Sequence, residues 1–320
     1  MEITSVCVLG GSGFVGRHVC QQLAARGYRV RVPTRSRERA KQLILLPTVD
    51  VVAANIHDPE GLRETVAGAE AVINLVGVLH DGRGEESFAA AHMELARKVV
   101  AACKVCGVRR LLHMSALNAD PAGPSAYLRS KGEAERIVRE SGVSATILRP
   151  SVIFGPDDRF LNPFAQALKF LPVMVLPCPR ARFQPVYVED VATVFASSLE
   201  DLASGGKAYD LCGPRVYTLR ELVEYVGTVT GCRRPIIGLN DTLSYAQARG
   251  MELPLIKQLM RTFDMLMTRD NFRSMTVDSV CGCALPFDLI PAALEAVAPA
   301  WLATDTPRSR YQRFRNHAGR

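Results

Sequence analysis

Short hydrophobic runs alternate with longer amphipathic segments through the first half of the chain. Runs rich in valine, leucine and isoleucine predict buried strands, whereas apolar side chains at every third or fourth position predict helices. The predicted strands are 5–10, 29–32, 49–54, 71–77, 109–115 and 144–150. The predicted helices between them include 14–26, 87–106 and 125–141. This alternation predicts an α/β fold of the Rossmann type, a doubly wound parallel sheet with helices on both faces.

The pattern changes after Pro150, where proline-rich loops separate the helices expected near 160–170, 189–203, 218–230 and 286–297. We interpret this part as a smaller, mixed C-terminal lobe on the substrate side. The predicted organisation is a dinucleotide-binding domain at 1–157, to which 185–203 return, the lobe at 158–307, and a basic tail at 308–320.

A glycine-rich turn, "LGGSGFVGRH", follows the first predicted strand and opens the first helix. Glycine permits a sharp turn and a close approach to a pyrophosphate, while the helix N-terminus adds N–H groups and partial positive charge. At this junction of an alternating chain the pattern is a specific signal for a dinucleotide site. The residues expected to contact the cofactor are Gly10, Gly11, Ser12, Gly13, Phe14, Val15 and Gly16.

The end of the second predicted strand, "VRVPTRSRERA", bears on which dinucleotide is bound. NAD sites commonly place a carboxylate there to hold the ribose hydroxyls, but this stretch has no acid before Glu38. Arg35 can instead grip a 2′-phosphate with two N–H donors. NADP(H) is therefore favoured over NAD(H), with a solvated basic turn as the alternative interpretation of Arg35.

The stretch "SAYLRSKGEAE" places Tyr127 four residues before Lys131. On a helix these two side chains share one face, where the lysine charge favours the phenolate and prepares the tyrosine to exchange a proton. The same spacing also occurs by chance on surface helices, so the pair by itself leaves both interpretations open.

The net charge of +7 is concentrated at the C-terminus, because residues 308–320 hold five arginines and no acid, which leaves 7 − 5 = +2 for the rest. A solvated tail is one interpretation, and a tail that binds an anionic membrane surface or an acidic partner such as a respiratory complex is the other. The near-neutral body gives no reason to expect a nucleic-acid partner.

Nine cysteines are scattered along the chain, including Cys103 and Cys106 in a C-x-x-C and Cys281 and Cys283 in a C-x-C. Neither the cysteines nor the histidines have metal-site spacing, so we expect buried free thiols, a reducing compartment and no metal. We see no signal peptide and no membrane-spanning run. A cytoplasmic location is expected, with peripheral attachment to the inner face of the cytoplasmic membrane as an option.

Beside the glycine turn, the chain carries "NLVG" at 74–77, "YLRSK" at 127–131, "LRPSVIFGP" at 148–156 and "PVYVEDVA" at 185–192. With these motifs it resembles the short-chain dehydrogenase/reductase superfamily, in its extended or atypical branch, over nearly its whole length. More narrowly, "YLRSKGEAE", "IFGPDDRFLNPFA" and "QPVYVEDVA" resemble the nucleotide-binding accessory subunits of respiratory complex I and their bacterial relatives.

The resemblance implies roles for residues that the patterns alone do not assign. Tyr127 and Lys131 become the active-site pair, with Lys131 also on the nicotinamide ribose. Further cofactor contacts are implied for Ile56, Val76, Gly77, Pro150 and Ile153, the last two in the nicotinamide pocket.

Two positions depart from the family pattern. The place of the catalytic serine or threonine falls on Ala116 or Leu117, which leaves Ser115 as an uncertain catalytic candidate. An asparagine that supports proton relay is replaced near His92, where a buried structural histidine is the simpler interpretation.

The leading hypothesis is an NADP(H)-binding oxidoreductase that transfers hydride to or from an unidentified carbonyl or quinone-type substrate. One alternative is a non-catalytic nucleotide-binding accessory or assembly subunit of the complex I type. A second alternative is a sugar-nucleotide epimerase or dehydratase, which Arg35 disfavours because those enzymes mostly hold NAD.

Overall fold

The computed structural model describes residues 3–253 and 267–303. The basic tail expected at 308–320 lies outside these residues. The described chain divides into two compact units, one built from 3–151, 188–212 and 281–291, the other from 152–187, 213–253, 267–280 and 292–303.

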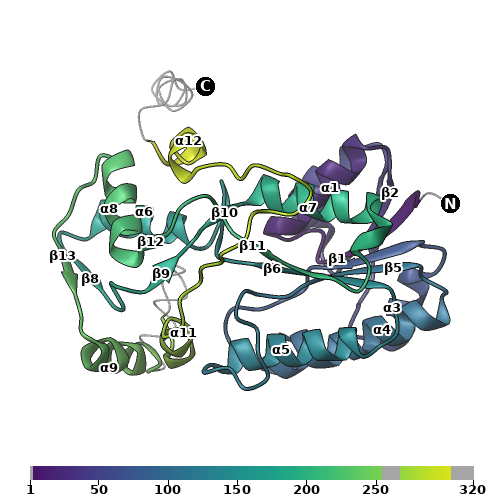
Figure 1. Ribbon diagram of the computed structural model, residues 1–320, viewed down its shortest axis with the longest axis horizontal. Helices are drawn as coiled ribbons and strands as arrows, with labels where there is room; N and C mark the ends of the chain where they lie inside the picture. The colour runs from purple at the N-terminus through teal and green to yellow at the C-terminus, as the bar shows by residue number, and fades with distance from the viewer. Residues whose placement is uncertain (1–2, 254–266, 304–320) are drawn as a thin grey trace. The chain divides into compact units, whose positions relative to one another are not determined.

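The first unit is built on a seven-stranded sheet with the order β11-β6-β5-β4-β1-β2-β3 (Figure 1). Its strands are β1 Ser5–Leu9, β2 Arg29–Thr34, β3 Val49–Ala53, β4 Ala71–Asn74, β5 Arg110–Met114, β6 Ala145–Pro150 and β11 Ala208–Leu211. Every neighbouring pair is parallel, as the apolar runs predicted. The strand order reverses between β1 and β4, which is where such sheets bind nucleotides, beyond the carboxyl ends of the strands.

Helices cover both faces of this sheet (Figure 1). They are α1 Phe14–Ala25, α2 Lys41–Ile44, α3 Pro59–Val66, α4 Leu95–Val105, α5 Ala126–Arg139 and α7 Val188–Glu200. α1 packs against α7, and α4 packs between α3 and α5. The predicted doubly wound architecture is confirmed.

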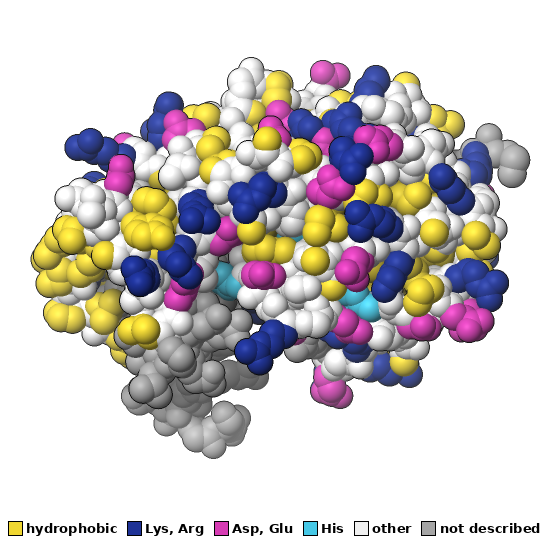
Figure 2. All heavy atoms as spheres, turned by 90° about the horizontal axis from the view of Figure 1, so that it is seen from below, with side chains coloured by type: hydrophobic (Ala, Val, Ile, Leu, Met, Phe, Trp, Pro, Cys, Tyr) yellow, Lys and Arg dark blue, Asp and Glu magenta, His cyan; other side chains and the backbone are white. Residues whose placement is uncertain are grey.

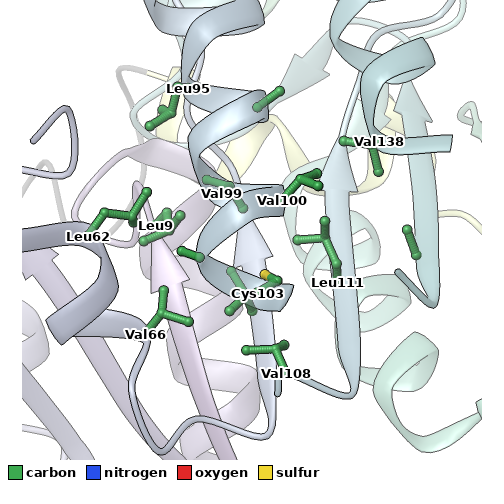
Figure 3. Packing of buried hydrophobic residues seen from close by; sticks show 14 of the residues in the cluster. Leu9, Leu62, Val66, Leu95, Val99, Val100, Cys103, Val108, Leu111 and Val138 are labelled. Atoms are coloured by element: carbon green, nitrogen blue, oxygen red, sulfur yellow. The ribbon is translucent and has the colours of Figure 1, made fainter. Parts of the chain in front are cut away.

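The core under α3 and α4 is made of aliphatic side chains from both layers (Figure 3). Leu9 and Leu111 from the sheet and Leu62 and Leu95 from the helices are fully buried. Burial of each such side chain stabilises the fold by about 1.5–3 kcal/mol. This packing fixes the strand ends from which the candidate site is built.

The long helix predicted at 87–106 differs from a regular α-helix. It begins with a π-helical segment, Ala89–Glu94, and only then continues as α4. Such segments are rare and frequently lie at functional sites. His92 belongs to this segment.

The second unit holds α6 Leu161–Phe170, α8 Leu219–Val229, α9 Asp241–Met251, α11 Arg269–Ser274, α12 Leu294–Val297 and α13 Pro299–Leu302. Three strand pairs accompany them, β7 Ile153–Phe154 with β10 Val186–Tyr187, β8 Met174–Leu176 with β13 Ile236–Gly238, and β9 Arg182–Phe183 with β12 Tyr217–Thr218. Its core includes Phe154, Leu168 and Leu222. α9 and α11 had no counterpart among the predicted helices.

The helix predicted at 286–297 is mostly wrong. Phe287 and Asp288 have φ values of 63° and 54°, left-handed conformations that no regular α-helix contains. Only Leu294–Val297 is helical.

The expectation of buried free thiols is wrong for at least three cysteines. Cys281 forms a disulfide with Cys212, and Cys283 is an exposed free thiol. Cys7, Cys20 and Cys103 are buried free thiols as expected, and burial raises the pKa of each to about 12.

Within 3–253 and 267–303, no helix is long and apolar enough to cross a membrane. The same residues contain no group of three or more histidine, cysteine, aspartate or glutamate side chains that could hold a metal ion.

Candidate active site

The glycine-rich loop after β1 closes so tightly that side chains are excluded at several positions. A Cβ on Gly16 would lie 2.3 Å from the Gly10 carbonyl oxygen, and one on Gly11 would lie 2.8 Å from Cγ1 of Val32. Gly10 adopts a φ of 79°, which favours glycine. The loop therefore needs glycine at these three positions for its own geometry.

Gly13 differs from these three glycines, because it stands at the start of α1 and fewer atoms surround it. A Cβ there would meet only the Gly10 carbonyl oxygen, at 3.2 Å. No side chain caps α1, and its first turn holds no acidic residue. The backbone N–H groups and the helix dipole can thus face a bound anion. This cradle fits the pyrophosphate of a dinucleotide, with Ser12, Phe14 and Val15 supplying the adjoining backbone.

At the end of β2, Arg35 forms an ion pair that the sequence did not suggest. Its Nη1 atom lies 2.7 Å from Oε2 of Glu85, in the short helix Gly84–Glu86 after β4. Asn55 donates to the other carboxylate oxygen of Glu85 at 3.2 Å. The hydrogen bond from Asn55, together with the nearby charges of His57 and Arg35, holds the pKa of Glu85 below its ordinary value. Ile56, next to Asn55, packs half-buried against the core.

Fifty residues separate Arg35 from Glu85, and no periodicity or motif marks the second. An acid therefore does stand beside the end of β2, although it comes from another element. Side-chain exposures of 57% and 41% leave both charges open to solvent.

Tyr127 and Lys131 occupy the start of α5, which Ser125 caps by accepting from the Leu128 N–H at 3.1 Å. Lys131 is 3% exposed, and its Nζ donates to the Met114 carbonyl at the end of β5, 3.2 Å away. Burial lowers the pKa of Lys131 to about 8. Burial also raises the pKa of Tyr127 to about 12, opposite in direction to the shift toward neutrality that the family role suggests.

His92 joins the loop after β4 to α5. Its Nε2 accepts the Val78 N–H at 3.1 Å, so the proton belongs on Nδ1, which donates to Oγ of Ser130 at 2.8 Å. Ser130 in turn donates to the Tyr127 carbonyl at 2.9 Å. Burial and the nearby Lys131 charge lower the pKa of His92 to about 2. A permanently neutral imidazole thus holds these elements together, which agrees with the expected structural histidine.

Gly77 leaves the space that this arrangement needs. A Cβ on Gly77 would lie 3.0 Å from Nζ of Lys131 and 3.5 Å from Nε2 of His92. Val76, beside it, packs half-buried against the core. The structure therefore brings Gly77, Lys131 and His92 together at the carboxyl ends of β4 and β5.

Ser115 is not joined to this group. Its hydroxyl lies on the side of Glu135. Burial is the largest single effect on the Glu135 carboxyl and raises its pKa, but the effects of Arg149, Arg139 and Ser115 together lower that pKa below its ordinary value. Glu135 pairs mainly with Arg149 and Arg139. Glu135 is two helical turns beyond Tyr127, and the role of Ser115 beside the tyrosine hydroxyl stays a prediction.

Pro150 ends β6, and its carbonyl accepts the Leu117 N–H at 3.0 Å. Ile153 lies in β7 of the other unit, where it pairs with Val186. Their joint role in a nicotinamide pocket stays a prediction.

Comparison with known proteins places this geometry in a family. A family model described as NAD(P)H-binding matches residues 10–160, and one described as the 3-beta hydroxysteroid dehydrogenase/isomerase family matches residues 120–220. A ceramide reductase of Caulobacter vibrioides is 30% identical over 236 residues, covering 74% of this chain and 74% of that enzyme.

The chain belongs to the extended short-chain dehydrogenase/reductase superfamily.

Other relatives are respiratory subunits of the same superfamily type. The mitochondrial NADH dehydrogenase (ubiquinone) 1 alpha subcomplex subunit 9 of Arabidopsis thaliana is 38% identical over 226 residues, and that of Mus musculus is 34% identical over 228. The matches cover 68% and 70% of this chain but only 56% and 60% of those subunits.

Solved dehydrogenase/reductase structures share the fold. An Escherichia coli NADPH-dependent quinone oxidoreductase complexed with NADPH has a TM-score of 0.71 at 20% identity, covering 92% of this chain and 99% of that one. A Streptomyces venezuelae dTDP-glucose 4,6-dehydratase with NAD bound has a TM-score of 0.65 at 21% identity, covering 73% and 84%. At these identities the likeness establishes the fold alone.

Proposed function

We propose that this superfamily member binds NADP(H) and reduces a carbonyl or quinone-type substrate. The NAD(P)H-binding family match supports the nucleotide class, and the buried, hydrogen-bonded Lys131 one turn from Tyr127 is the single observation that carries the chemistry. The substrate itself is unidentified.

The dinucleotide supplies the hydride when bound, and the chain supplies the proton and the positioning. A Tyr127 pKa of about 12 keeps the phenol protonated at neutral pH, so it suits the role of proton donor to the carbonyl oxygen. Lys131, with a pKa of about 8, is mostly charged at pH 7 and stabilises the phenolate that remains. His92 holds the loop after β4 to α5, and Gly77 leaves room for the Lys131 ammonium group.

Preference for NADP(H) over NAD(H) is the finer part of the proposal. Arg35 supports it because a guanidinium can bind a 2′-phosphate bidentately. Glu85 opposes it, since the carboxylate already occupies one side of that guanidinium. We propose that NADP(H) is preferred and that Glu85 limits the preference.

An accessory subunit that binds nucleotide without turnover is the second candidate. The replacement of the family's serine or threonine by Ala116 or Leu117 supports it, as do the names of the respiratory relatives. On this proposal the partner would be a respiratory complex. We place the protein in the cytoplasm or on the inner face of the cytoplasmic membrane. The sugar-nucleotide alternative has no observation in its favour beyond the shared fold.

The test measures NADPH oxidation by the full chain with a panel of quinones, aldehydes and ketones. Tyr127→Phe should lower turnover about a hundredfold or more with little change in NADPH affinity, because only the proton donor is lost. Lys131→Ala should lower both turnover and affinity. Tyr245→Phe, in α9 of the other unit, is the matched control.

The two candidates give different results. Turnover should fall as pH rises through about 8, when Lys131 loses its charge. A parent protein that binds NADPH but turns over none of these substrates would favour the accessory subunit. Lys131→Ala that binds NADPH as tightly as the parent would refute the assignment of the pair to a cofactor site.

A further inference from the structure

The second unit exposes a group of apolar side chains that its own core does not use. Phe170 is 79% exposed, Ile237 54% and Val175 44%, with Leu171 and Val173 beside them at 40% and 36%. We call these five residues the β8–β13 face. Figure 2 shows hydrophobic side chains gathered at the left of the view, where Figure 1 places β8 and β13.

The strand pairing makes this face continuous. β8 and β13 are parallel, and Val175 lies directly opposite Ile237. Strand alternation turns Met174 and Leu176 into the core, so Val175 must point outward. Phe170 ends α6 just before β8. Large aliphatic and aromatic side chains therefore cover the outside of a two-stranded sheet, where polar residues are the ordinary choice.

The chain segments that build this face are rich in cations, although acids lie close by, since Asp241 follows β13 and Asp278 lies 3.6 Å from Arg182. Residues 159–188 and 225–240 contain six arginines and lysines and no aspartate or glutamate, namely Arg159, Lys169, Arg180, Arg182, Arg233 and Arg234. Arg234 donates to the Leu168 carbonyl at 3.1 Å, which fixes its guanidinium beside the end of α6. The nearby Glu224 is paired with Arg220.

A hollow of about 330 Å³ opens next to these cations. Arg233, Arg234 and Ile236 line it together with Leu168 and Gly227, and Glu224 lines it as well. Apolar side chains, cations and a recess thus lie together on one part of the second unit.

We propose that the β8–β13 face docks this protein on a bilayer that contains anionic phospholipid. Phe170, Val175 and Ile237 enter the interfacial zone, while Lys169, Arg233 and Arg234 meet lipid phosphates. Binding of this kind combines buried apolar area with attraction to anionic headgroups, and long basic side chains can snorkel beside apolar ones. The excess of cations around this face favours such a surface over a second copy of the chain, which would bring the same cations face to face. The proposal is independent of the nucleotide site.

Flotation of the full chain with vesicles tests it. Vesicles of phosphatidylcholine with phosphatidylglycerol should bind the protein, and pure phosphatidylcholine should bind it much less. Phe170→Ser combined with Ile237→Ser should lower the partition coefficient about tenfold or more. Arg233→Gln should lower it about fivefold on anionic vesicles. Leu45→Ser and Lys104→Gln, exposed residues of the first unit, are the matched controls and should change nothing.

One further variant and one further measurement separate the other occupants. Replacing the five arginines of 308–320 with glutamine tests the tail, and the proposal is overturned if that variant loses binding while Phe170→Ser with Ile237→Ser keeps it. It is also overturned if the parent is a dimer by light scattering that these apolar substitutions dissociate, with no vesicle binding by either protein. The proposal is supported if Phe170→Ser with Ile237→Ser loses vesicle binding while the tail variant keeps it.

Discussion

At the residue scale, the ion pair between Arg35 and Glu85 changes how the cofactor preference is understood. The sequence near the end of β2 shows Arg35 with no acid before Glu38, whereas in the structure its Nη1 atom lies 2.7 Å from the Glu85 carboxylate. An NADP 2′-phosphate would have to share or displace that partner. The pair is exposed, so its strength is modest and a ligand can compete with it.

Glu85→Gln should raise the affinity for NADP(H) relative to NAD(H) by about two- to fivefold, because it frees the Arg35 guanidinium. Arg35→Ala should lower the same ratio by about tenfold or more, since it removes a charge-assisted contact. Calorimetric titration with both nucleotides measures the ratio. Glu38→Gln is the control, and an unchanged ratio in both test variants would show that neither residue selects the cofactor.

Two buried histidines give a pH dependence of stability. Burial lowers the pKa of His92 to about 2 and of His113 to about 3, whereas an unfolded histidine titrates near 6.5. Because the folded pKa values are depressed, this stability is fully present above pH 6.5 and is lost as the pH falls below it. At pH 5 each histidine should lower the free energy of unfolding by about 2 kcal/mol relative to pH 7.

Urea unfolding at pH 7 and pH 5 measures this loss. The double variant His92→Asn with His113→Asn should show a shallower pH dependence than the parent, and His57→Gln, a half-exposed imidazole, should change the slope less. Equal slopes in all three proteins would contradict the assignment of the loss to the two buried rings.

At the scale of elements, sequence predicted what local apolar patterns determine. The first six strands of the sheet follow from runs such as "SVCVLG", and the glycine turn follows from close backbone contacts that admit no Cβ. The π-helical segment at 89–94 could not be predicted, because its residues have ordinary helical periodicity and the contact of His92 with Ser130 joins residues far apart in the sequence. The pairing of Glu85 with Arg35 could not be predicted either, since Arg35 follows β2 whereas Glu85 follows β4. The helix predicted at 286–297 was wrong because Pro291 interrupts it and because Phe287 and Asp288 are left-handed.

The disulfide between Cys212 and Cys281 closes a loop of the chain with a sequence separation of 69. Restricting the unfolded chain over that length should contribute about 4 kcal/mol to the free energy of unfolding. Cys212→Ser and Cys281→Ser should therefore lower the denaturation midpoint equally, and a reducing agent should lower that of the parent to match. Cys178→Ser is the control. A parent whose midpoint does not respond to reductant would show that the pair is not oxidised in solution.

At the scale of the whole molecule, nucleotide binding should stabilise the fold through mass action. At a concentration a hundred times its Kd, NADPH should add about 2.7 kcal/mol to the free energy of unfolding. Gly13→Val should abolish this gain and leave the fold intact, because its Cβ meets only one atom in the protein but lies where the pyrophosphate would approach. Thermal shift measures both, with Gly250→Ala as the control. A full NADPH shift in Gly13→Val would contradict the loop assignment.

The seventh strand has a consequence for how the chain is made. β11 completes the sheet beside β6, yet its residues follow β6 by more than fifty positions, and 281–291 return to the same unit later still. During synthesis from the N-terminus, β6 therefore waits with an unpaired edge until Ala208–Leu211 have left the ribosome. Unpaired edges invite association between nascent chains. The sheet of the first unit can thus be completed only after residue 211 has been synthesised. Chains released before that point would present the open edge of β6 to the cell.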